Sequence, residues 1–297
     1  VAGASIMIER DYFERLGRFD ERYEMAYYED TDLAMSVRAS GRRVLYQPHS
    51  EVIHHEGISS GTDLGSGQKQ YQVSNAKLFF EKWRDELSSN LENASDPVKA
   101  SDRTVKSHIL SIDECTPTPD QDSGSIDMFN MIKILISLGY RVHFIPRSNF
   151  AFFDDYTRTL QGMGVECIYA PFYKSVEEFL NERGDMFSHV FLVRVTAARE
   201  YLDTVKTHCP SAKRVFYTVD LHHLREKREA ELRDDDELRE IAAATEASEI
   251  GLMKDVSTTI VLSEAETQML EDRGVNGLIT LPLIREIKRP TEAPFAR

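Results

Sequence analysis

The sequence predicts an α/β protein in two parts, a partial α/β module followed by a doubly wound domain built on a parallel sheet. From residue 104 onward, short apolar segments alternate with helical segments, which is typical of a parallel sheet covered by helices on both faces. Before residue 88 the order is different, with two β-permissive segments among several helices. The length of 297 residues also fits about two domains.

The first part covers residues 1–87. Strands are expected at 4–8 and 43–46, and helices at 11–17, 32–40 and 68–87. Gly17 and Gly41 follow two of these helices, where glycine readily adopts the left-handed conformation that ends a helix. The last helix has an apolar face, because large side chains recur at helical spacing. These are Tyr71, Leu78, Phe79 and Trp83.

Residues 88–103 are polar and lack an apolar period, so we interpret them as a linker. The second part, residues 104–297, has six apolar segments expected to be strands. They lie at 108–113, 141–146, 165–170, 189–194, 214–219 and 258–263. Right-handed crossovers through the helices between them would give a Rossmann-like domain. Residues 224–241 alternate acids and bases, which indicates one solvated helix with ion pairs on its surface.

Charge and cysteine content narrow the classes of function. The net charge of -14, from 36 basic and 50 acidic residues, disfavours a nucleic-acid groove and binding to an anionic membrane. No apolar segment reaches the ~20 residues that a membrane span needs. The three cysteines are far apart, which indicates a reducing compartment. We therefore expect a cytoplasmic protein, with peripheral attachment to the inner face of the membrane as the open alternative.

A first candidate site combines acids at a helix start with a histidine at a strand end. Glu29, Asp30 and Asp32 precede or begin the helix at 32–40, where the helix dipole and free N–H groups favour ionised carboxylates. An ionised Asp30 could serve as a general base towards a sugar hydroxyl. The alternatives are a simple helix cap, or a metal pair of Asp30 and Asp32, although Asp32 is expected to face away. His54 could bind a divalent ion that bridges a diphosphate, or could be structural.

These segments, in this order, resemble the C-terminal half of the family-2 glycosyltransferases of the GT-A fold. The resemblance covers residues 1–87 through RLGRFDERY, YYEDTDLAMSVRASGRRVLYQP, VIHHEGISSG and FFEKW. It implies an inverting, metal-dependent transfer from a nucleotide-sugar, with Mn²⁺ or Mg²⁺ as the cofactor. It also implies that Asp30 is the catalytic base, that Glu29 holds the acceptor and that His54 binds the metal. Asp20 and Glu21 would belong to the acceptor-side loop.

A second candidate site lies at the predicted carboxyl ends of the strands in the second part. Asp113, Arg194 and Asp220 each end an apolar segment, and ligands of open α/β sheets bind at these ends. Gly124, in a turn after the first strand, would let a ligand approach a helix N-terminus. Each of these residues could equally be a cap or a partner in a salt bridge.

This second part resembles the N-terminal Rossmann-like domain of family-4-type GT-B glycosyltransferases. The resemblance covers about residues 104–290 and is carried by DECTPTPDQDSG, GYRVHFIP and TVDLHHLREKRE. It implies that Ser123, Gly124 and Ser125 face an acceptor cleft, with Arg194, Asp220 and His222 as further acceptor-binding candidates. No cofactor is expected here.

The chain is therefore expected to be an internal part of a tandem glycosyltransferase that acts in surface polysaccharide synthesis. The donor would be a nucleotide-sugar, and the acceptor a glycan or a lipid-linked sugar. The resemblance places the donor-binding half of the first module before Val1 and the second GT-B domain after Arg297, so little activity is expected of this chain alone. The alternatives are a non-catalytic scaffold that docks acceptors and a metal-dependent hydrolase that uses Asp30 and His54.

Overall fold

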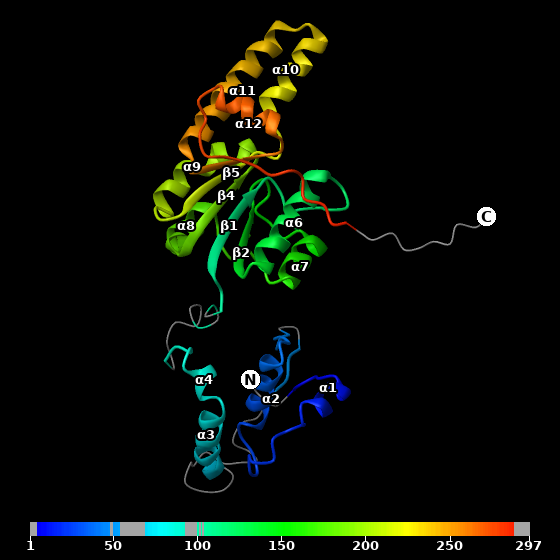
Figure 1. The fold of residues 1–297 in the computed structure, drawn as a ribbon, viewed down its shortest axis with the longest axis vertical. Helices are drawn as coiled ribbons and strands as arrows, with labels where there is room; N and C mark the ends of the chain where they lie inside the picture. The colour runs from blue at the N-terminus through cyan, green and yellow to red at the C-terminus, as the bar shows by residue number, and fades with distance from the viewer. Residues whose placement is uncertain are drawn as a thin grey trace, which may run out of the picture. The chain divides into compact units, whose positions relative to one another are not determined.

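The computed structural model describes residues 5–47, 50–53, 69–92, 100, 102 and 104–287. The chain divides into two compact units, unit 1 over Val1–Arg103 and unit 2 over Thr104–Arg297. Figure 1 shows the elements of both units.

Unit 2 contains a seven-stranded parallel sheet with the order β3-β2-β1-β4-β5-β6-β7. The strands are β1 Ser107–Asp113, β2 Tyr140–Pro146, β3 Glu166–Cys167, β4 Phe187–Val193, β5 Lys213–Tyr217, β6 Thr258–Val261 and β7 Leu278–Thr280. The predicted α/β class and parallel sheet are thus confirmed. Strand order reverses between β1 and β4, and this reversal is where doubly wound sheets open a ligand crevice.

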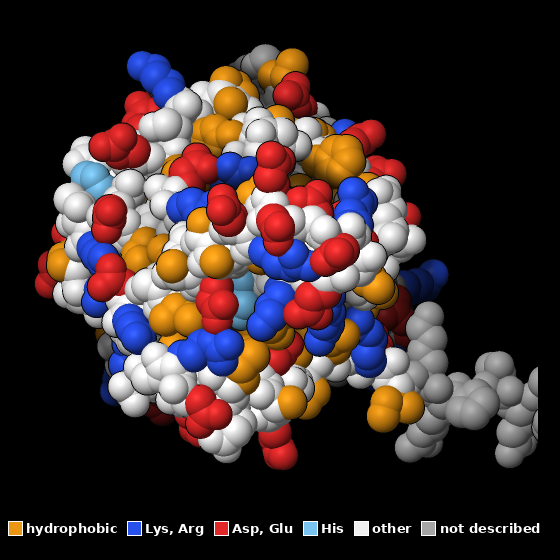
Figure 2. Space-filling view, turned by 90° about the horizontal axis from the view of Figure 1, so that it is seen from above, with side chains coloured by type: hydrophobic (Ala, Val, Ile, Leu, Met, Phe, Trp, Pro, Cys, Tyr) orange, Lys and Arg blue, Asp and Glu red, His pale blue; other side chains and the backbone are white. Residues whose placement is uncertain are grey.

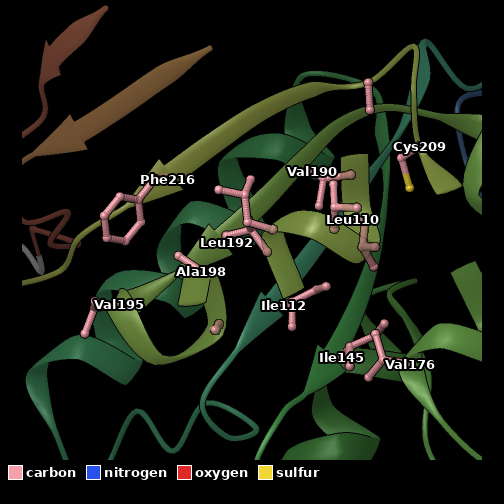
Figure 3. Close-up of a cluster of buried hydrophobic side chains, with 14 of the residues drawn as sticks. Leu110, Ile112, Ile145, Val176, Val190, Leu192, Val195, Ala198, Cys209 and Phe216 are labelled. Atoms are coloured by element: carbon pink, nitrogen blue, oxygen red, sulfur yellow. The ribbon is translucent and has the colours of Figure 1, made fainter. Parts of the chain in front are cut away.

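Helices cover both faces of this sheet. They are α6 Ser123–Ser137, α7 Asp154–Gly162, α8 Val176–Arg183, α9 Arg194–His208, α10 His222–Arg233, α11 Asp236–Asp255 and α12 Glu264–Glu271, with the short 3-10 helix η2 at Gly184–Met186. Because neighbouring strand residues point to opposite faces, Leu110 and Ile112 of β1 pack with α8, α9, α11 and α12. Figure 3 shows these two side chains beside Val190 and Leu192 of β4. Ile109 points the other way, toward α6 and α7.

An extended segment, residues 281–287, completes the cover of the α6 face. Leu281 and Ile284 pack against the cluster that includes Tyr217 of β5. The buried Asp127 accepts the backbone N–H of Ile284 at 2.5 Å, and the amide of Asn130 donates to the carbonyl of Ile284 at 2.9 Å. Figure 1 shows this red segment running back from β7 to α6. Two polar side chains of α6 thereby fix the extended segment against this face.

The structure corrects two expectations for unit 2. Residues 224–241 form two helices and not one, because Asp234 is left-handed (φ 52°) and Asp235 caps α11 by accepting from the N–H groups of Glu237 and Leu238. The predicted solvated surface is present, because Ala230 is the single buried residue of this range and ion pairs such as Arg233 with Glu229 lie on the exposed side. Strand β7, only three residues long, was not predicted because so short a segment carries no alternating pattern.

Unit 1 contains the helices α1 Arg10–Arg15, α2 Glu29–Ala39, α3 Gln70–Lys82 and α4 Arg84–Leu87. The strands predicted at 4–8 and 43–46 are wrong for the residues that can be described there, which pair in no ladder. A strand is stabilised by a neighbour that bonds its backbone, and the apolar composition of these segments does not supply one. Most of their side chains are exposed, Met7 completely and Leu45 to 74%.

The core of unit 1 is small and aromatic. Tyr23, Phe79 and Trp83 are buried together, with Tyr28 among the side chains packed against them. The helix expected at 68–87 is interrupted at Trp83, where the backbone leaves the helical region (φ -109°, ψ 22°). Phe79 and Trp83 of the predicted apolar face are buried, whereas Leu78 is 38% exposed.

Gly184 provides a test of packing in unit 2. A Cβ at this position would lie 2.1 Å from the carbonyl oxygen of His208, so we expect Gly184→Ala to lower the free energy of unfolding by about 1–3 kcal/mol. Gly162→Ala is the matched control, since nothing lies within 4 Å of its Cβ position. Urea denaturation followed by circular dichroism would compare the two variants. Equal midpoints for both would contradict the packing seen at Gly184.

Candidate functional site

Asp30 lies on the wall of a hollow of about 360 Å³ in unit 1. The remaining wall comes from residues 5–9, from α1, from 42–45 and from the α2 residues Leu33 and Val37. Asp30 and these two residues share one face of α2, as the helical spacing requires. The Asp30 carboxylate accepts from the backbone N–H of Thr31 at 2.6 Å and from its hydroxyl at 3.1 Å. These bonds fix the carboxylate at the edge of a space that could hold part of a ligand.

The loop before Asp30 has a strained backbone, and a side chain of α3 holds it by hydrogen bonds. Tyr27 and Tyr28 both have left-handed backbones, with φ of 77° and 78°, although neither is glycine. Such conformations cost about 1–3 kcal/mol each and persist only where the surroundings impose them. The buried amide of Asn75 imposes this one, because it donates to the carbonyls of Glu24, Ala26 and Tyr27 at 3.1, 2.9 and 3.1 Å. The start of α2 is thus positioned by a side chain of α3.

Asp32 lies on the opposite side of α2 from this hollow, as expected. It is 3% exposed and accepts three hydrogen bonds. The donors are the Tyr23 hydroxyl at 3.0 Å, the Trp83 indole at 2.7 Å and the Lys82 ammonium at 2.8 Å. With its oxygens engaged in the core, Asp32 does not pair with Asp30 as a two-carboxylate metal site. It is a structural residue, and two of its partners, Lys82 and Trp83, lie about fifty positions away, so the nearby sequence does not indicate this role.

Asp20 and Glu21, the predicted acceptor-side residues, differ in environment. Asp20 forms ion pairs with Arg22 at 2.6 Å and Lys82 at 2.9 Å. The hydrogen bonds from Arg22, and then those from Lys82, hold the pKa of Asp20 far below its usual range. Glu21 is exposed. Only Asp20 is therefore held in place by neighbours.

The metal prediction stays a prediction. His54, the predicted metal ligand, lies outside the described residues. Within the parts of the chain that the structure describes, no three His, Cys, Asp or Glu side chains are grouped so that they could hold a metal ion. Glu29 begins α2, and its buried Oε2 has no hydrogen-bond partner among these residues.

In unit 2, Asp113 and Arg194 meet at the reversal point of the sheet. Asp113 ends β1 and is 2% exposed, and its Oδ1 accepts from Arg194 Nε at 3.0 Å. Burial raises the pKa of Asp113 to about 6, although the positive charge of Arg194 acts in the opposite direction. The predicted proximity of these two strand ends is therefore present in the structure.

Gly124 allows Arg194 to lie against the start of α6. A Cβ on Gly124 would be 2.8 Å from Arg194 Nη2 and 3.3 Å from Val219 Cγ1. Arg194 and Val219 both have left-handed backbones, with φ of 68° and 62°. For a β-branched residue this is a rare conformation, and such strain clusters at ligand sites.

Asp122 was not singled out from the sequence, although it caps α6. Its carboxylate accepts from the backbone N–H of Ser125 at 2.8 Å and from the Ser125 hydroxyl at 2.5 Å. The N-terminus of α6 is thus already capped by a carboxylate of the chain. An aspartate three positions before Ser125 was the signal that could have identified this cap. The neighbouring Ser123 accepts from Arg285 at its carbonyl oxygen, at 3.3 Å.

Asp220 and His222 lie beside this cluster. Asp220 is 3.4 Å from the His222 ring and 2.8 Å from Arg225. The hydrogen bond with His222, and more weakly the charges of Arg225 and Arg194, lower the pKa of Asp220. The edge of the sheet therefore combines carboxylates with one central guanidinium. Such an edge suits hydroxyl groups, which can donate to the carboxylates, better than a bare phosphate.

The raised pKa of Asp113 predicts a pH dependence of stability. Because the folded pKa of about 6 exceeds the usual value of about 4, the folded state binds more protons between these pH values. This contribution to stability is complete below pH about 4 and is lost as the pH rises through about 6. Asp113→Asn should therefore flatten the fall in unfolding free energy across this window, as measured by urea denaturation at a series of pH values. The exposed Asp185→Asn should leave the slope unchanged, and an unchanged slope in Asp113→Asn would contradict the assignment.

Comparison with known proteins gives partial matches. The chain is 39% identical over 66 residues to an N-acetylglucosaminyl-diphospho-decaprenol L-rhamnosyltransferase of Mycobacterium tuberculosis, which is 22% of this chain and 21% of that protein. It is 36% identical over 63 residues to the O-antigen biosynthesis protein RfbC of Myxococcus xanthus, 21% of this chain and 5% of that protein. These matches support a glycosyltransferase family for part of the chain. The chain thus spans about a fifth or less of the length of these relatives.

No protein-family model matches the chain. In the described residues, no helix is both long enough and apolar enough to cross a membrane.

Proposed function

We propose that this chain is part of a tandem glycosyltransferase that transfers sugar from a nucleotide-sugar to a glycan or lipid-linked acceptor in polysaccharide synthesis. The observation that carries the proposal is the placement of Asp30 on the wall of a hollow, behind a strained loop that Asn75 holds. Strain maintained next to a carboxylate is typical of a site that positions a reacting group. The partial similarity to a rhamnosyltransferase and to an O-antigen biosynthesis protein supports the same reaction class.

In unit 1, we assign Asp30 as the base that removes a proton from the acceptor hydroxyl. Glu29 would hold the acceptor beside it, and Asp20 and Glu21 would lie on the acceptor side. His54 would bind a Mn²⁺ or Mg²⁺ ion, which supplies positive charge to the leaving diphosphate. The GT-A-like identity of this unit is part of the proposal.

In unit 2, we assign the edge around Asp113, Arg194 and Asp220 to acceptor binding, as in the first domain of a GT-B enzyme. The strand order and the reversal between β1 and β4 support a Rossmann-like domain with its ligand at this edge. The side chain of His222, beside Asp220, and the α6 residues Ser123, Gly124 and Ser125 would complete this surface. The carboxylates would accept hydrogen bonds from sugar hydroxyls.

The test is an assay of sugar transfer by the polypeptide that carries this chain, with a panel of nucleotide-sugars and lipid-linked or soluble glycan acceptors. We expect transfer that is lost with EDTA and restored by Mn²⁺ or Mg²⁺ if unit 1 acts as assigned. If transfer persists in the presence of EDTA and also in the Asp30→Asn variant, unit 1 does not catalyse it. Binding of acceptor without turnover of any donor would favour the alternative, a non-catalytic acceptor-docking scaffold.

A further inference from the structure

A groove between α10 and α11 of unit 2 is used by neither candidate site. It has a volume of about 280 Å³. Its walls carry His223, Lys227 and Glu231 of α10 and face Arg239, Ala243 and Glu246 of α11. The three α10 residues are four positions apart and so lie along one face of the helix. Figure 2 looks onto the end of unit 2 that carries these helices, where acidic and basic side chains are interleaved.

His223, which lines the groove, forms a buried pair with the carboxylate of Glu249. His223 is 1% exposed and Glu249 is completely buried, and His223 Nδ1 is hydrogen-bonded to Glu249. Glu249 also accepts from the backbone N–H groups of His222 at 3.0 Å and His223 at 3.1 Å, at the start of α10. The carboxylate therefore fixes both the helix start and the orientation of the imidazole ring.

The other ring nitrogen, His223 Nε2, is buried without a hydrogen-bond partner among the described residues. Nδ1 donates to the Glu249 carboxylate, so Nε2 is an acceptor when the ring is neutral, and a hydroxyl group can serve Nε2 in either form because it both donates and accepts. Nε2 lies on the ring edge away from Glu249, and His223 lines the groove. A buried acceptor that lacks a donor destabilises the protein, and a ligand with a hydroxyl group would supply that donor.

The remaining polar groups of the groove define the charge of such a ligand. Arg239 is occupied by Asp234 and Asp236, and Glu246 is paired with Arg273 at 2.6 Å. Lys227 and Glu231 form no ion pair within the described part of the chain. The groove thus offers one cationic donor, one carboxylate acceptor and one imidazole acceptor.

We propose that the α10–α11 groove binds a neutral polyhydroxyl ligand, namely one sugar ring. A hydroxyl group both donates and accepts, so one ring can donate to His223 Nε2 and to Glu231 and accept from Lys227. A free anion would meet Glu231, and a cation would meet Lys227. Because His223 directly follows His222 at the carboxyl edge of the sheet, the groove would extend an acceptor site there. That role rests on the proposed function, whereas sugar binding itself does not.

The test is a titration of the chain with the methyl glycosides of glucose, N-acetylglucosamine and rhamnose, observed through the ¹⁵N signals of the histidine rings by NMR. We expect saturable binding of at least one glycoside with a shift of the His223 Nε2 signal. Ala243→Leu should weaken that binding about tenfold or more, because the larger side chain occupies the groove. Ala244→Leu, an exposed neighbour that does not line the groove, should leave it unchanged within about twofold.

Three results would overturn the proposal. They are no saturation by any glycoside, equal loss in the two alanine variants, and tighter binding of inorganic phosphate than of every glycoside. Tighter binding of an oligosaccharide than of its methyl glycoside would support the proposal with a glycan chain as the natural ligand. Sugar binding by the chain, combined with no transferase activity in the intact polypeptide that carries it, would contradict the proposed function and leave this inference standing.

Discussion

Asp30→Asn in the intact polypeptide is expected to lower the rate of sugar transfer by unit 1 by about 10²–10⁴-fold, the usual contribution of a general base. Asparagine keeps the size of the side chain, and its amide oxygen can still accept from Thr31, whose N–H and hydroxyl bond Asp30 at 2.6 and 3.1 Å. The α2 start should therefore survive, while the proposed general base is lost. Initial rates at saturating donor would measure the effect, with urea denaturation as a check on folding.

Asp11→Asn is the matched control for this experiment. Asp11 also lies in the first turn of a helix, α1, and is exposed. Both substitutions remove one negative charge near a helix N-terminus, so a general effect of charge should appear in both. We expect full activity in Asp11→Asn. An Asp30→Asn enzyme with a rate near that of the native protein would show that another group acts as the base.

The architecture of unit 2 was predictable because each strand carries its own signal. A strand buried on both faces is a largely apolar segment, as in Ile109–Ile112 and Val190–Val193, and several helices are followed by glycine or proline, as α6 is by Gly139 and α9 by Pro210. Asp113 and Arg194 could be placed at one edge because parallel strands end on the same side. The break at Asp234 and the extended segment at residues 281–287 depend on a few individual side-chain contacts, which produce no periodic pattern in the sequence.

Unit 1 was harder to predict because its stability depends on contacts between distant residues. The strand expected at 43–46 follows from composition alone, yet a strand also needs a neighbour to bond its backbone. Asn75 contacts residues about fifty positions earlier, and nothing near it in the sequence indicates that role. The same holds for Glu249 and His223, which are 26 positions apart. Acids at a helix start could be recognised, whereas the side chains that position them could not.

Asp32→Ala is expected to destabilise unit 1 by about 3–5 kcal/mol, the typical cost of removing one partner from a buried polar network. The substitution leaves the Tyr23 hydroxyl and the Trp83 indole N–H without their acceptor inside the core. Lys82 keeps Asp20 at 2.9 Å and is not left unpaired. Trp83 is the single tryptophan of the chain, so its fluorescence during urea denaturation reports on unit 1 alone.

The matched control for Asp32 is Asp85→Ala, an exposed acid in the first turn of α4. Surface substitutions of this kind usually change stability by less than about 0.5 kcal/mol, so its midpoint should match that of the native protein. The unfolding midpoint of Asp32→Asn should lie between those of the native protein and Asp32→Ala. The amide oxygen of asparagine keeps one acceptor, but its NH₂ group cannot accept from Lys82. The order native, Asp32→Asn, Asp32→Ala would show that hydrogen-bond acceptance by Asp32 stabilises the core on which Asp30 is mounted. Coincident midpoints for all four proteins would instead mean that the aromatic side chains alone hold unit 1 together.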